Sequence, residues 1–185
     1  MEEDPRHLLV KIANILDKIG IPYFVTGGMA VLIWGRPRFT ADIDIIVELE
    51  LKEVDILVDY LSSLGEDSYV DKEMIKDALI SEGEFNFVHG DTGIKVDFWV
   101  LKKEPFELSK LKRRVGKDII GKKVYFSSPE DLILSKLLWR KQGAGEKHIE
   151  DAESVIRISK EKIDMDYLKE QAEKLGILEE LNKLL

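Results

Sequence analysis

The stretch from residue 23 to residue 47 reads YFVTGGMAVLIWGRPRFTADIDIIV, and it decides the fold more than any other part of the chain. Residues 23–26 are apolar and favour a strand, the pair Gly27-Gly28 follows, and residues 29–34 predict an apolar helix. A strand is therefore expected to run directly into a helix N-terminus. Glycines at such a turn let the backbone approach a ligand closely, and the free N–H groups of the first helical turn attract phosphate.

The same stretch ends in two alternating acids, Asp42 and Asp44, within the apolar run of Ile43, Ile45 and Val47. In a strand, a period of two places both carboxylates on one face and the apolar side chains on the other. Two neighbouring carboxylates repel each other unless a cation lies between them, and hard oxygen ligands of this kind suit Mg²⁺. The pattern therefore predicts a strand with a buried face and a metal-binding face.

Each motif also has a simpler interpretation. A Gly-Gly pair alone usually marks a turn, and Asp-x-Asp alone also occurs on a solvated strand face or as a metal motif of glycosyltransferases. Phosphatases of the haloacid dehalogenase type begin with Asp-x-Asp as well, but they expect Thr or Val two positions after the second acid. That position is Ile46 here, and those phosphatases have no Gly-Gly loop upstream.

Taken together, the motifs resemble the signature of the nucleotidyltransferase superfamily, the enzymes with a fold like that of DNA polymerase β. Thirteen residues separate Gly27-Gly28 from Asp42-Ile-Asp44, and Asp97, within the apolar residues 94–100, matches the third acid of the signature. The resemblance implies transfer of a nucleoside monophosphate from a nucleoside triphosphate (NTP) to an acceptor hydroxyl, with release of pyrophosphate. It also implies two Mg²⁺ ions held by Asp42, Asp44 and Asp97, since two metals stabilise the attacking and leaving oxygens of such a reaction.

A longer pattern is similar to abortive-infection-type (AbiEii-like) nucleotidyltransferases of bacteria and archaea, carried by Gly35, Arg38, Thr40, Asp42 and Asp44. The resemblance implies nucleotide contacts by Gly27, Gly28, Arg38, Thr40 and Lys136. Arg38 could instead only pair with the carboxylates beside it. His148 and Asp151 match a later motif of that group, but the Arg expected two positions before Lys147 is missing, so we interpret them as an exposed helix start.

The expected fold class is α/β (α+β), a small mixed sheet of the nucleotidyltransferase palm type with helices on one side and a helical C-terminal part. We expect domains at residues 1–126 and 127–185, or one compact domain. The patterns predict strands at 23–26, 42–48, 85–88, 94–100 and 123–126, and helices at 5–19, 28–35, 52–64, 71–81, 132–141, 148–159, 165–175 and 178–185. Residues 89–93 predict a hairpin turn, which would make His89 a surface residue.

Composition narrows the class of protein. The chain has 185 residues, 44% apolar and 35% charged, and no cysteine for a disulfide or a Cys-based zinc site. No apolar run approaches the ~20 residues that span a bilayer, and residues 1–6 lack the features of a signal peptide. We therefore expect a cytoplasmic protein without membrane contact, and the formal net charge of −8 argues against nonspecific coating of nucleic acid.

The acceptor is not specified by these patterns. Residues 102–123 contain nine basic and three acidic residues, which could steer an NTP or an RNA end, although a solvated basic loop is the simpler interpretation. The resemblance favours toxin-like action on tRNA, as in a toxin–antitoxin pair, over modification of a protein hydroxyl (AMPylation). A nonenzymatic relative that binds a nucleotide, a partner protein or a second copy of itself is the alternative class.

Overall fold

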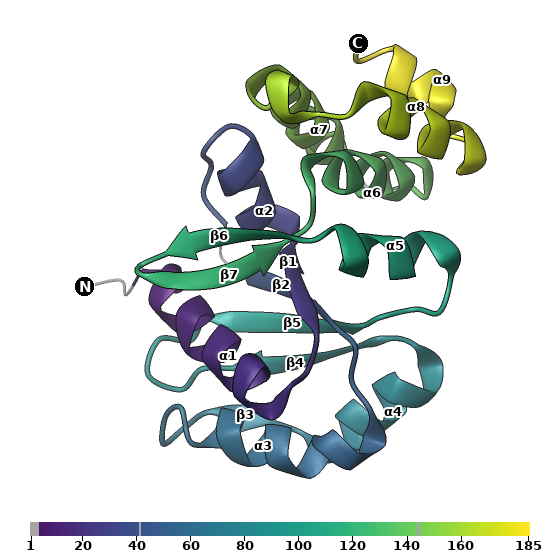
Figure 1. Ribbon diagram of the computed structural model, residues 1–185. Coiled ribbons are helices and arrows are strands. Elements are labelled where there is room, and N and C mark those ends of the chain that lie inside the picture. The colour runs from purple at the N-terminus through teal and green to yellow at the C-terminus, as the bar shows by residue number, and fades with distance from the viewer. Residues whose placement is uncertain (1–3, 41, 144) are drawn as a thin grey trace.

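The computed structural model describes residues 4–40, 42–143 and 145–185. Within these residues the strands form one seven-stranded mixed sheet in the order β3-β4-β5-β2-β1-β7-β6 (Figure 1). The bounds of the strands are β1 Tyr23–Thr26, β2 Asp42–Val47, β3 Tyr69–Val70, β4 Glu84–Val88, β5 Lys95–Val100, β6 Val115–Ile119 and β7 Lys122–Phe126. The fold class expected from the sequence is confirmed.

Helices precede, connect and follow these strands. Their bounds are α1 Pro5–Ile19, α2 Gly27–Trp34, α3 Val54–Ser62, α4 Lys72–Ser81, α5 Pro105–Arg113, α6 Pro129–Lys141, α7 Lys147–Ile158, α8 Met165–Lys174 and α9 Leu178–Asn182, with 3-10 turns η1 Leu51–Glu53 and η2 Lys160–Lys162. The capping signals act as expected, since the side chains of Asp4 and Ser128 accept hydrogen bonds from the first turns of α1 and α6.

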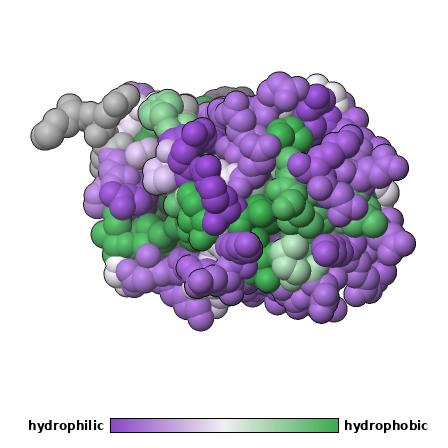
Figure 2. Space-filling view, turned by 90° about the horizontal axis from the view of Figure 1, so that it is seen from above, coloured by the Kyte–Doolittle hydropathy of each residue, from purple (hydrophilic) through white to green (hydrophobic). Residues whose placement is uncertain are grey.

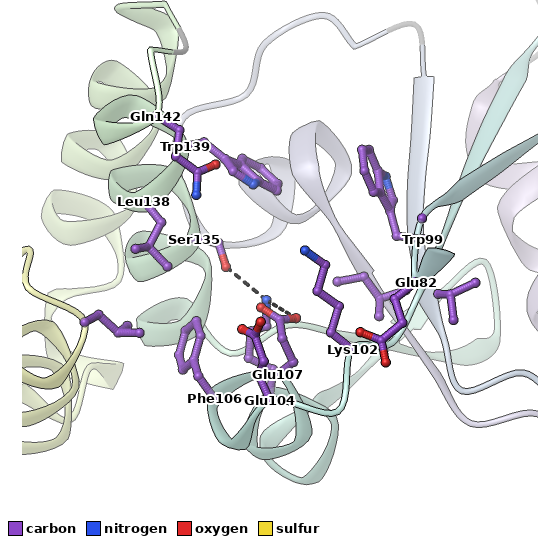
Figure 3. A pocket seen from close by; sticks show the side chains of 15 residues that line it. Glu82, Trp99, Lys102, Glu104, Phe106, Glu107, Ser135, Leu138, Trp139 and Gln142 are labelled. Atoms are coloured by element: carbon purple, nitrogen blue, oxygen red, sulfur yellow. Dashed lines mark hydrogen bonds and ion pairs between the residues drawn. The ribbon is translucent and has the colours of Figure 1, made fainter. Parts of the chain in front are cut away.

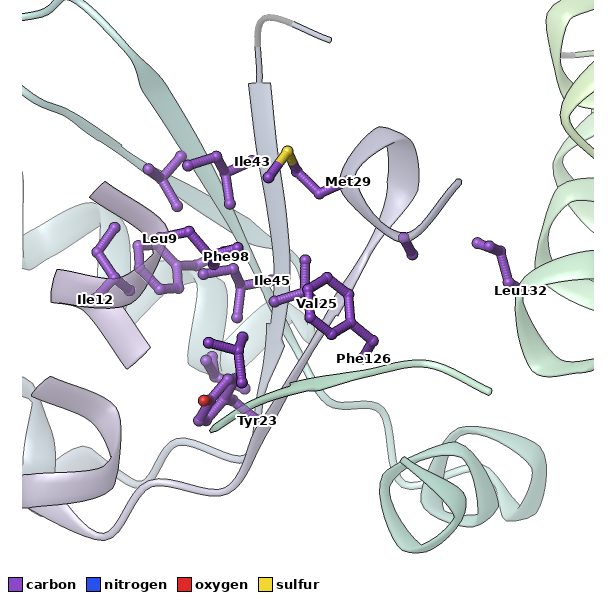
Figure 4. Close-up of a cluster of buried hydrophobic side chains, with 14 of the residues drawn as sticks. Leu9, Ile12, Tyr23, Val25, Met29, Ile43, Ile45, Phe98, Phe126 and Leu132 are labelled. Atoms are coloured by element: carbon purple, nitrogen blue, oxygen red, sulfur yellow. The ribbon is translucent and has the colours of Figure 1, made fainter. Parts of the chain in front are cut away.

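One face of the sheet forms the main core. Ile43, Ile45 and Phe98 point from β2 and β5 toward Leu9 and Ile12 of α1 (Figure 4), and all five side chains are fully buried. Helices α1, α3 and α4 cover this face, because α1 contacts α3 and α4 packs on β4 and β5. The apolar half of each alternating strand thus lies beneath helices, as the period of two predicts.

The opposite face is only partly covered. Phe24, Ile46, Leu101 and Leu111 form a second, smaller apolar cluster there, so α5 packs on the face that also carries Asp44, two residues before Ile46. The expectation of helices on one side only is therefore wrong. Asp42 and Asp44 of β2 and Asp97 of β5 lie on this same face.

The C-terminal helices join the sheet through α2. The indole of Trp34 donates to the carbonyl of Ser127 over 2.8 Å, and the hydroxyl of Ser159 donates to the carbonyl of Trp34 over 2.6 Å. Buried residues of α6 to α9 belong to the same apolar cluster as those of the sheet. The domain division between residues 126 and 127 stays a prediction.

Several local expectations change. The sequence patterns missed β3, α5 and β6, so the basic segment 102–123 is a helix and a hairpin rather than a solvated loop. His89 is 1% exposed and not on the surface, because its ring bonds to Thr92 and to the carbonyl of Leu64. Residues 1–3 of the predicted N-terminus, Ala41 of the linker before Asp42 and Ala144 of the predicted helix break lie outside the described residues.

The outer surface is consistent with the composition. Seen from above the view of Figure 1, a band of hydrophobic residues crosses the middle of a mostly hydrophilic face (Figure 2). Among the described helices, none combines the length and apolar character that crossing a membrane requires.

Candidate active site

The three predicted acids lie on two neighbouring strands of the open face. Strands β2 and β5 are parallel, and Asp44 is the register partner of Asp97. Asp42 lies two residues before Asp44 and therefore on the same face, where its side chain is exposed while those of Asp44 and Asp97 are half-buried. The fold thus brings Asp97 beside Asp42 and Asp44, although more than fifty residues of sequence separate Asp44 from Asp97.

The Gly27-Gly28 turn lies directly against these acids. Strand β1 pairs with β2 so that Thr26 is opposite Asp44, and the turn into α2 follows at once. Gly27 has a φ of +59°, and a Cβ added there would overlap the carboxylate of Asp44. A Cβ on Gly28 would overlap the hydroxyl of Thr40. A side chain at either position would have to displace Asp44 or Thr40, and the first turn of α2 opens beside the acids.

Two lysines partly offset the negative charge of the three acids. Burial raises the pKa of Asp44 above its ordinary 3.8, and the nearby carboxylates of Asp97 and Asp42 act in the same direction, while Lys136 opposes them. Lys95 pairs with Asp97, its Nζ lying 2.7 Å from Oδ1. Within the described ranges, no three acidic or histidine side chains are already arranged to hold a metal ion. A cation at the acids would have to compete with the ammonium of Lys95.

Two cations from outside the sheet meet at one buried carboxylate. Arg38 binds Asp151 through two hydrogen bonds, from Nε over 2.8 Å and from Nη2 over 3.0 Å. Lys136 of α6 donates to the same carboxylate over 2.8 Å. The side chains of Lys136 and Asp151 are 3% and 4% exposed. Arg38 therefore does pair with a carboxylate, but with Asp151 rather than with the acids next to it in sequence.

The sequence interpretation of Asp151 as part of an exposed helix start was wrong, because the residue is buried between Arg38 and Lys136. His148 is half-buried, and its ring packs edge-on against Trp139 with centroids 5.5 Å apart. Burial and the nearby Lys136 lower the pKa of His148, so the ring is neutral at pH 7. Its Nδ1 is buried and has no hydrogen-bond partner among the described residues.

The structure thus groups Asp42, Asp44, Asp97, Gly27, Gly28 and Thr40 around one end of β2, and Lys136 lies close enough to affect the pKa of Asp44. Residues that sequence reasoning missed are Lys95, Trp99 and Trp139, whereas Asp151 was named but interpreted as exposed. The signal for Trp99 was present, since Lys95, Asp97 and Trp99 alternate along one strand. Trp139 follows Lys136 by three residues on a helix, a spacing that makes the two neighbours.

We expect Asp151→Asn to lower the free energy of unfolding by about 3 kcal/mol, because two cations would be left beside a buried neutral amide. Glu150→Gln is the matched control on the same helix, since the Glu150 side chain is 64% exposed and lies 4.0 Å from Arg36. It should change stability by less than ~0.5 kcal/mol. Urea unfolding monitored by circular dichroism measures both.

The same contacts predict a pH dependence. Burial opposes ionisation of Asp151, but Arg38 and Lys136 outweigh it and hold the pKa of that carboxyl below its ordinary 3.8. A lowered folded-state pKa gives stability that is present above the unfolded-state pKa and is lost as pH falls through the folded-state pKa. The difference between wild type and Asp151→Asn should therefore shrink below about pH 4. A difference that is constant down to pH 2 would contradict the assignment.

The sheet order, the glycine turn and the paired acids together define a class: the chain has the nucleotidyltransferase fold. Solved structures agree. The antibiotic-resistance factor ANT(2'')-Ia matches with a TM-score of 0.61 at 18% identity, covering 99% of each chain. A nucleotidyltransferase-like protein of Paracoccidioides brasiliensis matches with a TM-score of 0.56 at 21% identity, covering 82% of this chain and 75% of its own.

The lincosamide antibiotic adenylyltransferase LnuA, with lincomycin bound, matches with a TM-score of 0.54 at 15% identity, covering 84% of this chain and 98% of its own. In comparisons of sequence, no family model and no curated protein matches the chain. The resemblance to the nucleotidyltransferase superfamily is confirmed at the level of the fold. A particular closeness to the abortive-infection type is not among the similarities found.

Proposed function

We propose that this protein is a Mg²⁺-dependent nucleotidyltransferase that transfers a nucleoside monophosphate from an NTP to an acceptor hydroxyl. The observation that carries the proposal is the register pairing of Asp44 with Asp97 directly beside the Gly27-Gly28 turn. A phosphate-binding helix start and a pair of facing carboxylates are the two parts that such a reaction needs at one place. LnuA, which has this fold, is an adenylyltransferase, in agreement with the proposal.

The residues present fit the implied metal. Asp42, Asp44 and Asp97 supply only hard oxygen ligands, and the pKa of Asp44 is raised by burial first and then by the neighbouring carboxylates, whose repulsion a divalent cation would relieve. When bound, Mg²⁺ would stabilise the negative charge that develops on the phosphate oxygens. Lys95 would then give up its contact with Asp97, since both cannot hold the same carboxylate oxygens.

The chain's own groups divide the remaining work. The backbone N–H groups after Gly27, together with Thr40, would hold the phosphates, and Lys136 and Arg38 would offset their charge from the helical side. Asp151 fixes both cations and is therefore a positioning residue. The acceptor oxygen forms a bond to the α-phosphorus, the bond to the bridging oxygen breaks, pyrophosphate leaves, and the hydroxyl proton passes to the carboxylate of Asp97.

The acceptor that the sequence favoured is tRNA, with toxin-like consequences in the cytoplasm, and a protein hydroxyl is the alternative. The support for tRNA weakens at the basic segment. The guanidinium of Arg113 lies 3.6 Å from the ring centre of Tyr167, Arg114 stacks on Tyr125, and Lys110 is buried. These three side chains are engaged within the protein, whereas Lys102, Lys103, Lys112 and Lys123 of the same segment are exposed.

The test is to incubate the protein with each α-labelled NTP, Mg²⁺ and, in separate reactions, cellular RNA, protein or small-molecule extract. If the protein transfers a nucleotide, pyrophosphate is released and one of the acceptor fractions becomes labelled. Asp97→Asn should keep NTP affinity within about threefold while the transfer rate falls by roughly 10²-fold or more. NTP binding without pyrophosphate release in any reaction would instead identify a nonenzymatic relative of the same fold.

A further inference from the structure

A pocket of about 580 Å³ lies where helix α4 ends and helix α5 begins (Figure 1). We call it the α4–α5 pocket. Its walls come from the last residues of α4, the segment that follows β2, the end of β5 and one side chain of α5. Glu48 follows the last residue of β2, about 20 Å along the strand from Asp42, which begins it. The pocket is therefore at the opposite end of β2 from the first of the three acids.

Apolar side chains are exposed around this pocket. Ile80 of α4 is 84% exposed, and it lines the pocket together with the half-buried Leu79 and with Leu108 of α5, which is also exposed. One exposed aliphatic side chain is ordinary on a protein surface, but aliphatic residues from two helices around one pocket indicate an interaction site. A small molecule inside the pocket would leave the outermost side chain in water. A macromolecule that lies across the pocket would cover it.

Acidic groups accompany the apolar side chains. Glu48, Glu50 and Glu82 line the pocket, and Lys103 is the basic side chain among them. Glu50 is paired with Lys52 over 2.7 Å, whereas neither Glu48 nor Glu82 forms an ion pair within the described parts of the chain. The last turn of α4 contains no basic residue, so the negative end of its helix dipole adds to the same potential. The pocket therefore attracts cations.

Glu82 carries the clearest electrostatic signal. It caps the C-terminal end of α4, where a carboxylate opposes the helix dipole and a cation would be favourable. Glu82 also lines a second pocket, of about 430 Å³, between the sheet and α6, where Lys102 is part of the same wall (Figure 3). The carboxylate thus lies on the ridge between two pockets. A cation that approaches from the α4–α5 side would relieve its unfavourable position at the helix end.

The shape and the charge together identify the occupant. Strands β2 and β5, whose ends lie at the pocket, each have a neighbour on both sides in the sheet, so neither offers a free edge to an added strand. A second copy of the chain would bring a net charge of −8 toward the same acids. A helix with an apolar stripe flanked by basic residues matches both the aliphatic side chains and the acids.

We propose that the α4–α5 pocket is a docking site for a basic amphipathic helix of a partner protein. Apolar side chains of that helix, one turn apart, pack against Ile80 and Leu108, and its basic side chains lie against Glu48 and Glu82. The docked helix leaves the Gly27-Gly28 turn uncovered, because that turn lies beside the other end of β2. Docking therefore does not depend on nucleotidyl transfer.

A synthetic helix tests the docking. The probe is a fluorescently labelled peptide of about 14 residues, roughly four helical turns, in which leucines form one face and lysines the other. One control peptide has the same composition with the leucines spread around the helix, and a second has glutamate in place of lysine. Fluorescence anisotropy should show that the patterned basic peptide binds at least ~tenfold more tightly than either control.

Variants of the pocket should change this affinity in opposite directions. Ile80→Ser with Leu108→Ser should weaken binding by roughly tenfold or more, since two apolar contacts are lost. Glu48→Gln with Glu82→Gln should weaken it by about fivefold at low salt and less at high salt, and Lys103→Gln should tighten it by about twofold. Both serine substitutions are at exposed positions, so circular dichroism should show an intact fold.

The matched control is Ile158→Ser, another exposed aliphatic side chain, on α7, which should leave peptide affinity unchanged. Equal binding of the patterned and the rearranged basic peptides would overturn the docking site, and so would unchanged affinity in the serine double variant. A dimer in sedimentation velocity that the same variant abolishes would assign the surface to a second copy instead. Competition between the peptide and NTP with Mg²⁺ would move the helix to the acids and also overturn the assignment.

Discussion

Asp44→Asn is expected to lower the single-turnover rate of nucleotidyl transfer by roughly 10³-fold or more, because it removes the central carboxylate of the three. Asp44 is the register partner of both Thr26 and Asp97, so it is the acid that joins the glycine turn to β5. The rate is measured with labelled NTP at saturating Mg²⁺. A variant within tenfold of wild type would contradict the assignment of the metal site.

The same substitution should not destabilise the metal-free fold. Burial and the neighbouring acids raise the pKa of Asp44, so folding disfavours its ionised form at neutral pH. The neutral amide removes that penalty, and the melting temperature without metal should stay equal or rise. With Mg²⁺ the wild type should gain stability and the variant should not, because only the native state of the wild type binds the ion. Asp91→Asn, an exposed acid of the β4–β5 turn, is the control and should leave both quantities unchanged.

The centre of the site could be predicted because its signals are local. The spacing from Gly27-Gly28 to Asp42 and Asp44 is a property of one continuous strand, turn, helix and strand, and the alternation along β5 places Asp97 without knowledge of its partner. The parallel pairing of β2 with β5 could not be predicted in the same way. It depends on how α3, β3, α4 and β4 return the chain to the sheet, and many registers satisfy the same alternation.

The elements that were missed have weak local signals. Strand β3 has two residues, β6 contains a glycine and two charges, and α5 is mostly polar although Glu104-Pro105 marks its start. The burial of Asp151 is a different kind of failure. An acid near the start of a helix is usually exposed, and only the arrival of Arg38 and Lys136 from distant parts of the chain makes the burial of Asp151 favourable. Contacts of this kind are decided by tertiary structure.

Gly27→Ala is expected to lower the transfer rate by roughly 10²-fold, and the same substitution at a second glycine shows how much of this loss comes from backbone strain alone. Gly27 and Gly93 have similar positive φ angles, +59° and +67°, so the backbone strain of Ala at either position should lower the free energy of unfolding by about 1 kcal/mol. Only at Gly27 would the added methyl group overlap a functional side chain, the carboxylate of Asp44. At Gly93 the added methyl group would meet no atom of the described residues within 4 Å beyond its own chain neighbours.

The two variants should therefore agree in backbone strain and differ in activity. Gly93→Ala should transfer nucleotide within about twofold of wild type, since its added methyl group would contact no side chain of the site. Gly27→Ala must move either the carboxylate or the turn, and a displacement of about 1 Å in a reacting group lowers rates by roughly 10²-fold. Chemical unfolding and single-turnover transfer measure the two effects separately. Equal activity in the two variants would mean that the close approach of Gly27 to Asp44 has no part in the reaction, and that the glycine serves only the left-handed turn into α2.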